Sequence, residues 1–382
     1  MSVTKKCRMF TVLGVLLVPI FGGTANAQNV VVGVNVVNPM RASVTDQDTL
    51  LAELKAAQVH AIRSGITDDE KGIDFARRAA AEGIKLELIS SPQYRPNAPV
   101  RPYQPAEFPS MWSGHPLSSA DPQLSRVYFQ KLFDDLDANG IALASIELGN
   151  EINWAAFNPE FPLPGEGKVL ALSDLFHDPE GEQIANGFRQ YLKVLAVLKA
   201  VRDHSRLNRN TPIISAGLVG AKDGEKLYNN KKEDMVSLVA TIEFLRANGL
   251  DSLVDAYGIH TYPSAEQPGN PAVAAKRTIR FTSVDIAECR PAAAGSKPCW
   301  ITEWGFQNQD FSCPTKDSAT TLLVQEMRTD FANAASNGRL IGITYFAWNS
   351  DPWAKKPDPD SIYRCGTLTG SGRLAVAAMS TH

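Results

Sequence analysis

The sequence predicts an α/β protein that forms a single (β/α)8 barrel, also called a TIM barrel, over residues 28–382. Runs rich in β-branched residues alternate with segments of helical periodicity, which is typical of βα units around a parallel sheet. There are eight such runs, the number of strands that closes this barrel. The 355 residues after residue 27 also suit a barrel of about 250 residues that carries loop insertions.

The chain begins with the pattern of a secretory signal peptide. Lys5, Lys6 and Arg8 precede an apolar run over residues 10–21, and Ala25-Asn26-Ala27 supplies the small residues of a cleavage site. We therefore expect residues 1–27 to be removed after Ala27. The apolar run is well short of the ~20 residues that a membrane-spanning helix needs. We expect a secreted or periplasmic protein without a membrane span.

The charge of the mature chain disfavours nucleic acid as a partner. Of the 38 basic residues, three lie in the expected signal peptide, whereas all 41 acidic residues follow it, so the mature net charge is −6. Nucleic-acid-binding domains are usually basic. No linker or break in composition divides residues 28–382, so we expect one domain. We also expect the protein to be a monomer.

The eight expected strands follow one another at intervals that leave room for a helix after most of them. In chain order they are Val30–Val36, Ala61–Ile66, Ile84–Ile89, Ala144–Gly149, Ile213–Leu218, Asp255–His260, Cys299–Glu303 and Ile341–Trp348.

Helix signals lie between these runs. Thr67 and Glu70 form a capping box that predicts the start of a second helix. Asp121 followed by Pro122 is typical of an N-cap with proline at the first helical position. The longest helix is predicted by apolar residues at a 3.6-residue period: Ile184, Phe188, Tyr191, Leu192, Leu195 and Leu198.

Two connections are too long to be simple turns. One spans residues 91–121 and contains seven prolines, and the other spans residues 153–182 and is rich in proline, glycine and aromatic residues. Both follow the carboxyl ends of strands, where barrel enzymes build their active sites. Long loops in this position usually shape a binding cleft.

Four cysteines remain after the expected cleavage, and an even number in an exported protein indicates disulfides. Sequence alone permits three pairings. A barrel favours Cys289 with Cys299, before strand 7, and Cys313 with Cys365, which join the adjacent loops after strands 7 and 8. A strand of ~5 residues spans roughly 17 Å, too far for a bridge between its two ends. The cysteine and histidine spacings show no metal pattern, and we expect neither metal nor cofactor.

Two strands end in glutamate. The fourth run ends in Ile146-Glu147-Leu148-Gly149-Asn150-Glu151, and the seventh ends in Trp300-Ile301-Thr302-Glu303-Trp304-Gly305. Glu303 follows Glu151 by 152 positions. Two facing carboxyl groups are the minimum requirement for cleaving a glycosidic bond, because one protonates the leaving oxygen and the other attacks the anomeric carbon.

These two motifs resemble glycoside hydrolase clan A, the retaining barrel enzymes with an Asn-Glu acid/base on strand 4 and a glutamate nucleophile on strand 7. No single family within the clan is indicated. The resemblance implies that Glu151 is the acid/base, that Glu303 is the nucleophile, and that the enzyme cleaves a β-linked oligo- or polysaccharide by double displacement.

The resemblance also implies roles around the two glutamates. Arg63, at the end of strand 2, would orient the nucleophile, with a purely structural salt bridge as the alternative. His260 and Tyr262 would surround the nucleophile, although His260 suits a core position equally well. Trp348 would form the floor beneath the cleaved sugar.

Neighbouring residues complete the expected cleft. Asn150 would hydrogen-bond a sugar hydroxyl, and Trp154 and Trp304 would stack on sugar faces. Glu147 is interpreted as a structural partner, and Trp300 as a core residue.

Two other functions compete with this one. The chain could be a catalytically inactive carbohydrate-binding protein of the envelope, although the presence of both glutamates argues against this. It could instead hydrolyse an ester or amide, but it has no Gly-x-Ser-x-Gly motif.

Overall fold

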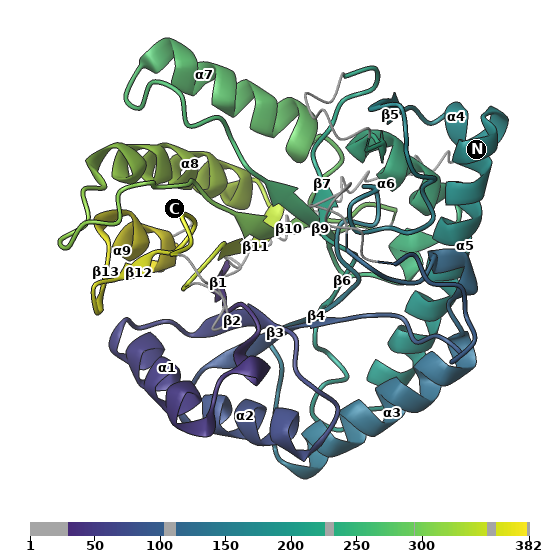
Figure 1. Ribbon diagram of the computed structural model, residues 1–382, viewed down its shortest axis with the longest axis horizontal. Coiled ribbons are helices and arrows are strands. Elements are labelled where there is room, and N and C mark those ends of the chain that lie inside the picture. Colours follow the sequence, from purple (N-terminus) through teal and green to yellow (C-terminus); the bar gives the residue numbers. More distant parts are fainter. Residues whose placement is uncertain (1–29, 103–111, 226–232, 294, 350–356, 380–382) are drawn as a thin grey trace, which may run out of the picture.

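The structure is a computed structural model that describes residues 30–102, 112–225, 233–293, 295–349 and 357–379. The expected signal peptide lies outside these residues. Figure 1 shows a ring of strands surrounded by helices. The strands are parallel, and their sequence order follows their order around the sheet. This confirms the predicted (β/α)8 barrel.

Eight strand positions form the barrel, and the fifth is divided into two short segments, β6 and β7. The strands are β1 (Val31–Asn35), β2 (Ala61–Ser64), β3 (Lys85–Ser90), β4 (Ser145–Leu148), β6 (Ile213–Ile214), β7 (Leu218–Val219), β9 (Tyr257–Thr261), β10 (Cys299–Trp304) and β11 (Leu340–Tyr345).

The divided fifth strand closes the barrel. β6 pairs with β4 on one side, and β7 pairs with β9 on the other. Parallel bridges join Asn150 to Gly217 and Ile214 to Ala256 across the same two seams. The single strand expected over Ile213–Leu218 is therefore found as two pieces.

Helices cover the outside of this sheet (Figure 1). They are α1 (Val44–Ala56), α2 (Glu70–Ala81), α3 (Pro122–Ala138), α4 (Asp174–His177), α5 (Pro179–Arg202), α6 (Leu238–Ala247), α7 (Pro271–Arg280), α8 (Ser318–Ser336) and α9 (Gly370–Val376). The six apolar residues that predict the longest helix all lie on the buried side of α5.

The helix starts confirm one capping prediction and correct another. Asp121 caps α3, because its carboxylate accepts hydrogen bonds from the N–H groups of the first turn. For α2, the cap is Asp69 and not Thr67. Thr67 donates its hydroxyl to Asp69, and Asp69 accepts from the backbone N–H of Gly72. A carboxylate at position 69 thus replaces the expected hydroxyl.

Both expected disulfides are present. Cys289 pairs with Cys299, and Cys313 pairs with Cys365. Short two-stranded sheets also form in the connections, where β5 (Val169–Leu170) pairs with β8 (Met235–Val236), and β12 (Tyr363–Arg364) pairs with β13 (Thr367–Leu368). No helix within the described residues has the length and apolar character required to cross a membrane.

Candidate active site

Glu151 lies just beyond the carboxyl end of β4, in an unusual backbone conformation. Gly149 has a φ of 84°, and Glu151 itself has a φ of 46°. A residue other than glycine rarely has a positive φ. Such a strained backbone conformation persists only where neighbouring contacts stabilise it. Here the backbone N–H of Glu151 donates to the carbonyl of Gly217, 2.8 Å away. This bond to the divided fifth strand aims Glu151 across the barrel mouth.

Glu303 faces the barrel mouth because β10 is irregular just before it. The register of β10 against β9 shifts between Ile301 and Glu303, and the register against β11 shifts between Ile301 and Trp304. An irregularity of this kind changes which side of the sheet the next side chain faces. Trp300 points into the barrel, where a Cβ on Gly342 would overlap its ring. The shift allows Glu303 to face the cleft as well.

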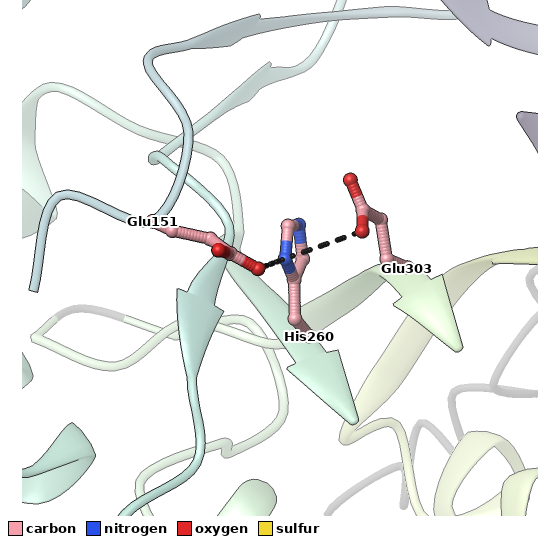
Figure 2. Close-up of side chains that lie close together, drawn as sticks. All are labelled: Glu151, His260 and Glu303. Atoms are coloured by element: carbon pink, nitrogen blue, oxygen red, sulfur yellow. Dashed lines mark hydrogen bonds and ion pairs between the residues drawn. The ribbon is translucent and has the colours of Figure 1, made fainter. Parts of the chain in front are cut away.

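His260 lies between the two glutamates (Figure 2). Its Nδ1 is 2.7 Å from Glu151 Oε1 and 3.6 Å from Glu303 Oε2. One oxygen of Glu151 and one oxygen of Glu303 lie within 4.8 Å of each other. All three residues are buried. The two carboxyl groups therefore face each other at short range, and the imidazole of His260 contacts both.

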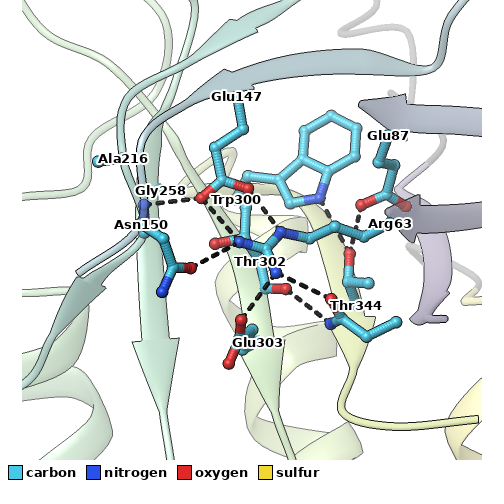
Figure 3. Close-up of polar contacts among 12 residues, drawn as sticks. Arg63, Glu87, Glu147, Asn150, Ala216, Gly258, Trp300, Thr302, Glu303 and Thr344 are labelled. Atoms are coloured by element: carbon cyan, nitrogen blue, oxygen red, sulfur yellow. Dashed lines mark hydrogen bonds and ion pairs between the residues drawn. The ribbon is translucent and has the colours of Figure 1, made fainter. Parts of the chain in front are cut away.

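Arg63 holds Glu303 from the other side (Figure 3). Its Nη1 donates to Glu303 Oε1 at 2.7 Å and to Asn35 Oδ1 at 2.8 Å. Its Nε and Nη2 donate to the two oxygens of Glu147, and Nη2 also donates to Asn150 Oδ1. Five hydrogen bonds use all five N–H donors of the guanidinium. Arg63 is thus both a structural ion-pair partner and a contact of Glu303.

Tyr262 engages the remaining oxygen of Glu303. Its hydroxyl donates to Oε2 at 2.5 Å, while its ring is about half exposed at the mouth. Both oxygens of Glu303 therefore accept hydrogen bonds, whereas Glu151 Oε2 is buried without a partner among the described residues. The two glutamates differ in the support that they receive.

This difference gives the two glutamates opposite pKa shifts. Burial opposes ionisation of Glu303, but the charges of His260 and Arg63 outweigh it, and the pKa of Glu303 is lowered. Burial raises the pKa of Glu151, and the hydrogen bond from His260 offsets only part of that rise. Although burial alone would lower it, the pKa of His260 is raised by the negative charges beside it. The site thus favours an ionised Glu303 and a protonated Glu151.

The structure is similar to several solved structures of glycosidases. A β-glucosidase from Thermotoga maritima matches with a TM-score of 0.50 and 11% identity over 91% of this chain and 97% of its own. A GH30 xylanase from Talaromyces cellulolyticus gives the same score and identity over 91% and 75%, and an intracellular xylanase from Thermoanaerobacterium saccharolyticum over 91% and 95%. The chain shares their barrel fold. The sequence matches no protein-family model and no curated protein.

The structure brings six of the expected site residues together at the barrel mouth: Glu151, Glu303, Arg63, Asn150, His260 and Tyr262. The three expected tryptophans lie differently. The indole of Trp154 is partly buried against Phe157, and its backbone N–H donates to the carbonyl of Glu151. Trp154 therefore adjoins the site through its backbone.

Trp304 lies in the core, which corrects the expectation that it contacts a sugar. Its ring packs edge-on against Phe331 of α8 and against Tyr345, and it is fully buried. The physical reason is the shift in β10. The irregularity that turns Glu303 toward the cleft turns the next residue toward the helix layer.

Trp348 is also fully buried, which corrects its expected role as the floor of the cleft. Its ring stacks on Tyr363 with 4.7 Å between ring centroids. β11 ends at Tyr345, three residues before the expected end, so Trp348 lies beyond the strand. Phe346 is closer to the site, because it is only partly buried and packs edge-on against Tyr262. Phe346, and not Trp348, is therefore the aromatic residue that lies beside Tyr262 after β11.

Sequence reasoning also missed Asn35. Its side-chain amide donates to the carbonyl of Thr302, and its oxygen accepts from Arg63. It links the residue before Glu303 to the arginine that holds Glu303. In the sequence, its role was indicated only by its position as a polar residue at the end of the first apolar strand.

Glu151, His260 and Glu303 also form the one group among the described residues whose donor atoms lie close enough to hold a metal ion. These atoms already bond to one another, to Arg63 and to Tyr262.

Replacing Arg63 by methionine is expected to destabilise the fold by about 3–5 kcal/mol, because it removes the guanidinium that pairs with the buried carboxylates of Glu147 and Glu303. Chemical denaturation measures this loss. Arg63→Lys is the matched control, since it restores the charge but not all five hydrogen bonds, and should recover part of the stability. An unchanged denaturation midpoint in Arg63→Met would contradict the role of Arg63 as the central cation.

Proposed function

We propose that the protein is a secreted, retaining glycoside hydrolase that cleaves β-linked oligo- or polysaccharides. Glu303 acts as the nucleophile, and Glu151 acts as the acid/base. The observation that carries this proposal is the short distance between the two carboxyl groups, with an oxygen of each within 4.8 Å of the other. Retaining enzymes place the two groups about 5–5.5 Å apart, whereas inverting enzymes need about 6.5–9.5 Å to admit a water.

In the first step, an oxygen of Glu303 attacks the anomeric carbon. The bond from that carbon to the leaving oxygen breaks, and Glu151 gives its proton to this oxygen. The products are a glycosyl ester on Glu303 and an ionised Glu151. The lowered pKa of Glu303 and the raised pKa of Glu151 suit these starting states.

In the second step, Glu151 accepts a proton from water while the water oxygen attacks the anomeric carbon. The ester bond to Glu303 breaks, which returns both glutamates to their first states. Loss of the charge on Glu303 in the ester removes repulsion from Glu151, so the pKa of Glu151 falls when it must act as a base. His260, bonded to Glu151, keeps the carboxyl group aimed at both reactions.

Export is supported by the two disulfides, because such bonds persist mainly in oxidising compartments. The β-glucosidase and xylanases that share the fold suggest the first substrates to try. We include β-linked glucosides and xylosides on this basis.

A panel of aryl β-glycosides and β-linked polysaccharides tests the proposal. We expect release of the aryl group or of reducing sugar from at least one of them, and ¹H NMR should show the β-anomer as the first sugar product. The α-anomer as first product would indicate inversion and refute the nucleophilic role of Glu303.

The rival functions give other results in the same panel. An inactive carbohydrate-binding protein would bind an oligosaccharide in calorimetry without cleaving it. A hydrolase of esters or amides would release nitrophenol from acyl esters and leave every glycoside intact.

A further inference from the structure

A further buried glutamate, Glu87, lies inside the barrel near the site. It faces Arg63 in register across the β2–β3 pair, so both side chains point into the barrel (Figure 3). Glu87 is 2% exposed. The proposed reaction does not use this carboxyl group.

Glu87 has no cation as a partner. Its Oε2 accepts a hydrogen bond from the hydroxyl of Thr344 at 2.5 Å, and Thr344 in turn accepts from the indole N–H of Trp300. Its Oε1 is buried without a hydrogen-bond partner among the described residues. This oxygen points at Gly33, where a Cβ would come within 2.1 Å of it. An ionised carboxylate in such surroundings is costly unless it is paired.

Arg63, the cation that acts on Glu87, has no free N–H donor among its hydrogen bonds. All five N–H groups of Arg63 are bonded, to Glu147, Glu303, Asn150 and Asn35. The charged groups that act on Glu87 are Arg63 from β2 and Glu147 from β4, while Trp300 from β10 and Thr344 from β11 are neutral. Arg63 could pair with Glu87 only by releasing another partner.

We propose that Glu87 is a positioning residue that keeps a proton, and thereby leaves every donor of Arg63 to the groups around the nucleophile. If Glu87 loses this proton, its charge competes for the guanidinium and draws it away from Glu303 and Asn150. The proton of Glu87 thus sets an upper pH limit on the alignment of the site. This catalytic consequence rests on the proposed function, whereas the retention of the proton does not.

The first test measures the proton without any substrate. Burial raises the pKa of Glu87 to about 7, whereas an unfolded glutamate has a pKa of about 4.3. The folded chain therefore holds an extra proton between these values, and its stability falls as the pH rises through this range and levels off above it. Relative to Glu87→Gln, the unfolding constant of the wild type should rise by up to about 10-fold per pH unit between pH 5 and 7. Parallel curves would overturn the proposal.

The second test measures the alignment of the site. An aryl β-glycoside with a highly activated leaving group needs little help from Glu151, so its kcat/KM reports the nucleophile and its supports. With a pKa of about 7, Glu87 should make the wild-type value fall about 10-fold from pH 6 to pH 8. Glu87→Gln should not show this fall. If its profile follows that of the wild type, Glu87 does not position Arg63.

Glu160→Gln is the matched control. Glu160 is also a buried carboxyl group with a raised pKa, but its partner is Ser118 and it has no contact with Arg63. Its substitution should leave the activity profile as in the wild type. Should Glu87→Gln not fold, Glu87→Met takes its place, since it is also neutral at every pH. If no glycoside is cleaved at all, the proposed function fails, and the unfolding experiment still decides whether Glu87 keeps its proton.

Discussion

Replacing Glu303 by alanine is expected to reduce kcat for the best aryl β-glycoside by about 10⁴-fold or more, which corresponds to about 5.5 kcal/mol of lost transition-state stabilisation. The reason is that no other carboxyl group can form the glycosyl ester at this position. The fold should remain intact, because Arg63 keeps its two bonds to Glu147 when Glu303 is removed. Circular dichroism and thermal unfolding check this point.

Rescue of the Glu303→Ala variant by azide provides a second test of the nucleophile. Azide that enters the space left in Glu303→Ala attacks the anomeric carbon from the nucleophile side and should give an α-glycosyl azide. Glu82→Ala, at the exposed end of α2, is the matched control and should retain the wild-type rate. A Glu303→Ala variant with a wild-type rate would remove the nucleophile assignment.

Replacing Glu151 by alanine is expected to affect substrates unequally. An aryl glycoside with a good leaving group needs little protonation, so its first step should survive far better than the cleavage of a natural glycan. Deglycosylation should then limit the rate, and added azide should restore it by forming a β-glycosyl azide. Product analysis by NMR and pre-steady-state release of the aryl group measure both effects. Equal losses on both substrates, with no response to azide, would show that Glu151 is not the acid/base.

The pH profile of the wild type on a natural glycan should depend on the same two groups and, on the alkaline side, on Glu87 as well. Glu303 must be ionised, so the acidic limb reflects its lowered pKa, and Glu151 must be protonated, so the alkaline limb reflects its raised pKa. Because the two carboxyl groups interact, each limb reports the pair.

The periodicity of the sequence predicted the barrel well, because each apolar run had to be buried between the barrel interior and a helix layer. The positions of Glu151 and Glu303 were predictable, because residues at the carboxyl ends of such runs lie together at one rim of the barrel. The backbone conformation of Glu151, with its positive φ, was not predictable, since it depends on a hydrogen bond to Gly217, 66 positions away in the chain.

The aromatic residues were predicted least well, for a related reason. Strict alternation along β10 and β11 would decide which rings face the cleft, but the register of β10 shifts next to Glu303 and β11 ends early. Trp304 and Trp348 therefore lie in the core, and Phe346 lies beside Tyr262. Irregularities in strands depend on how neighbouring strands and helices pack. The pattern of apolar residues along the sequence gives no information on that packing.

The second disulfide makes the two sides of the barrel mouth unequal. Cys313–Cys365 fastens the connections after β10 and β11 into one covalent unit on the side of Glu303. The connections over residues 91–121 and 153–182, on the side of Glu151, contain no cysteine and are joined by hydrogen bonds such as that from the N–H of Trp112 to the carbonyl of Ala156. The connections on the side of Glu303 are thus held together by a covalent bond, and those on the side of Glu151 by noncovalent contacts.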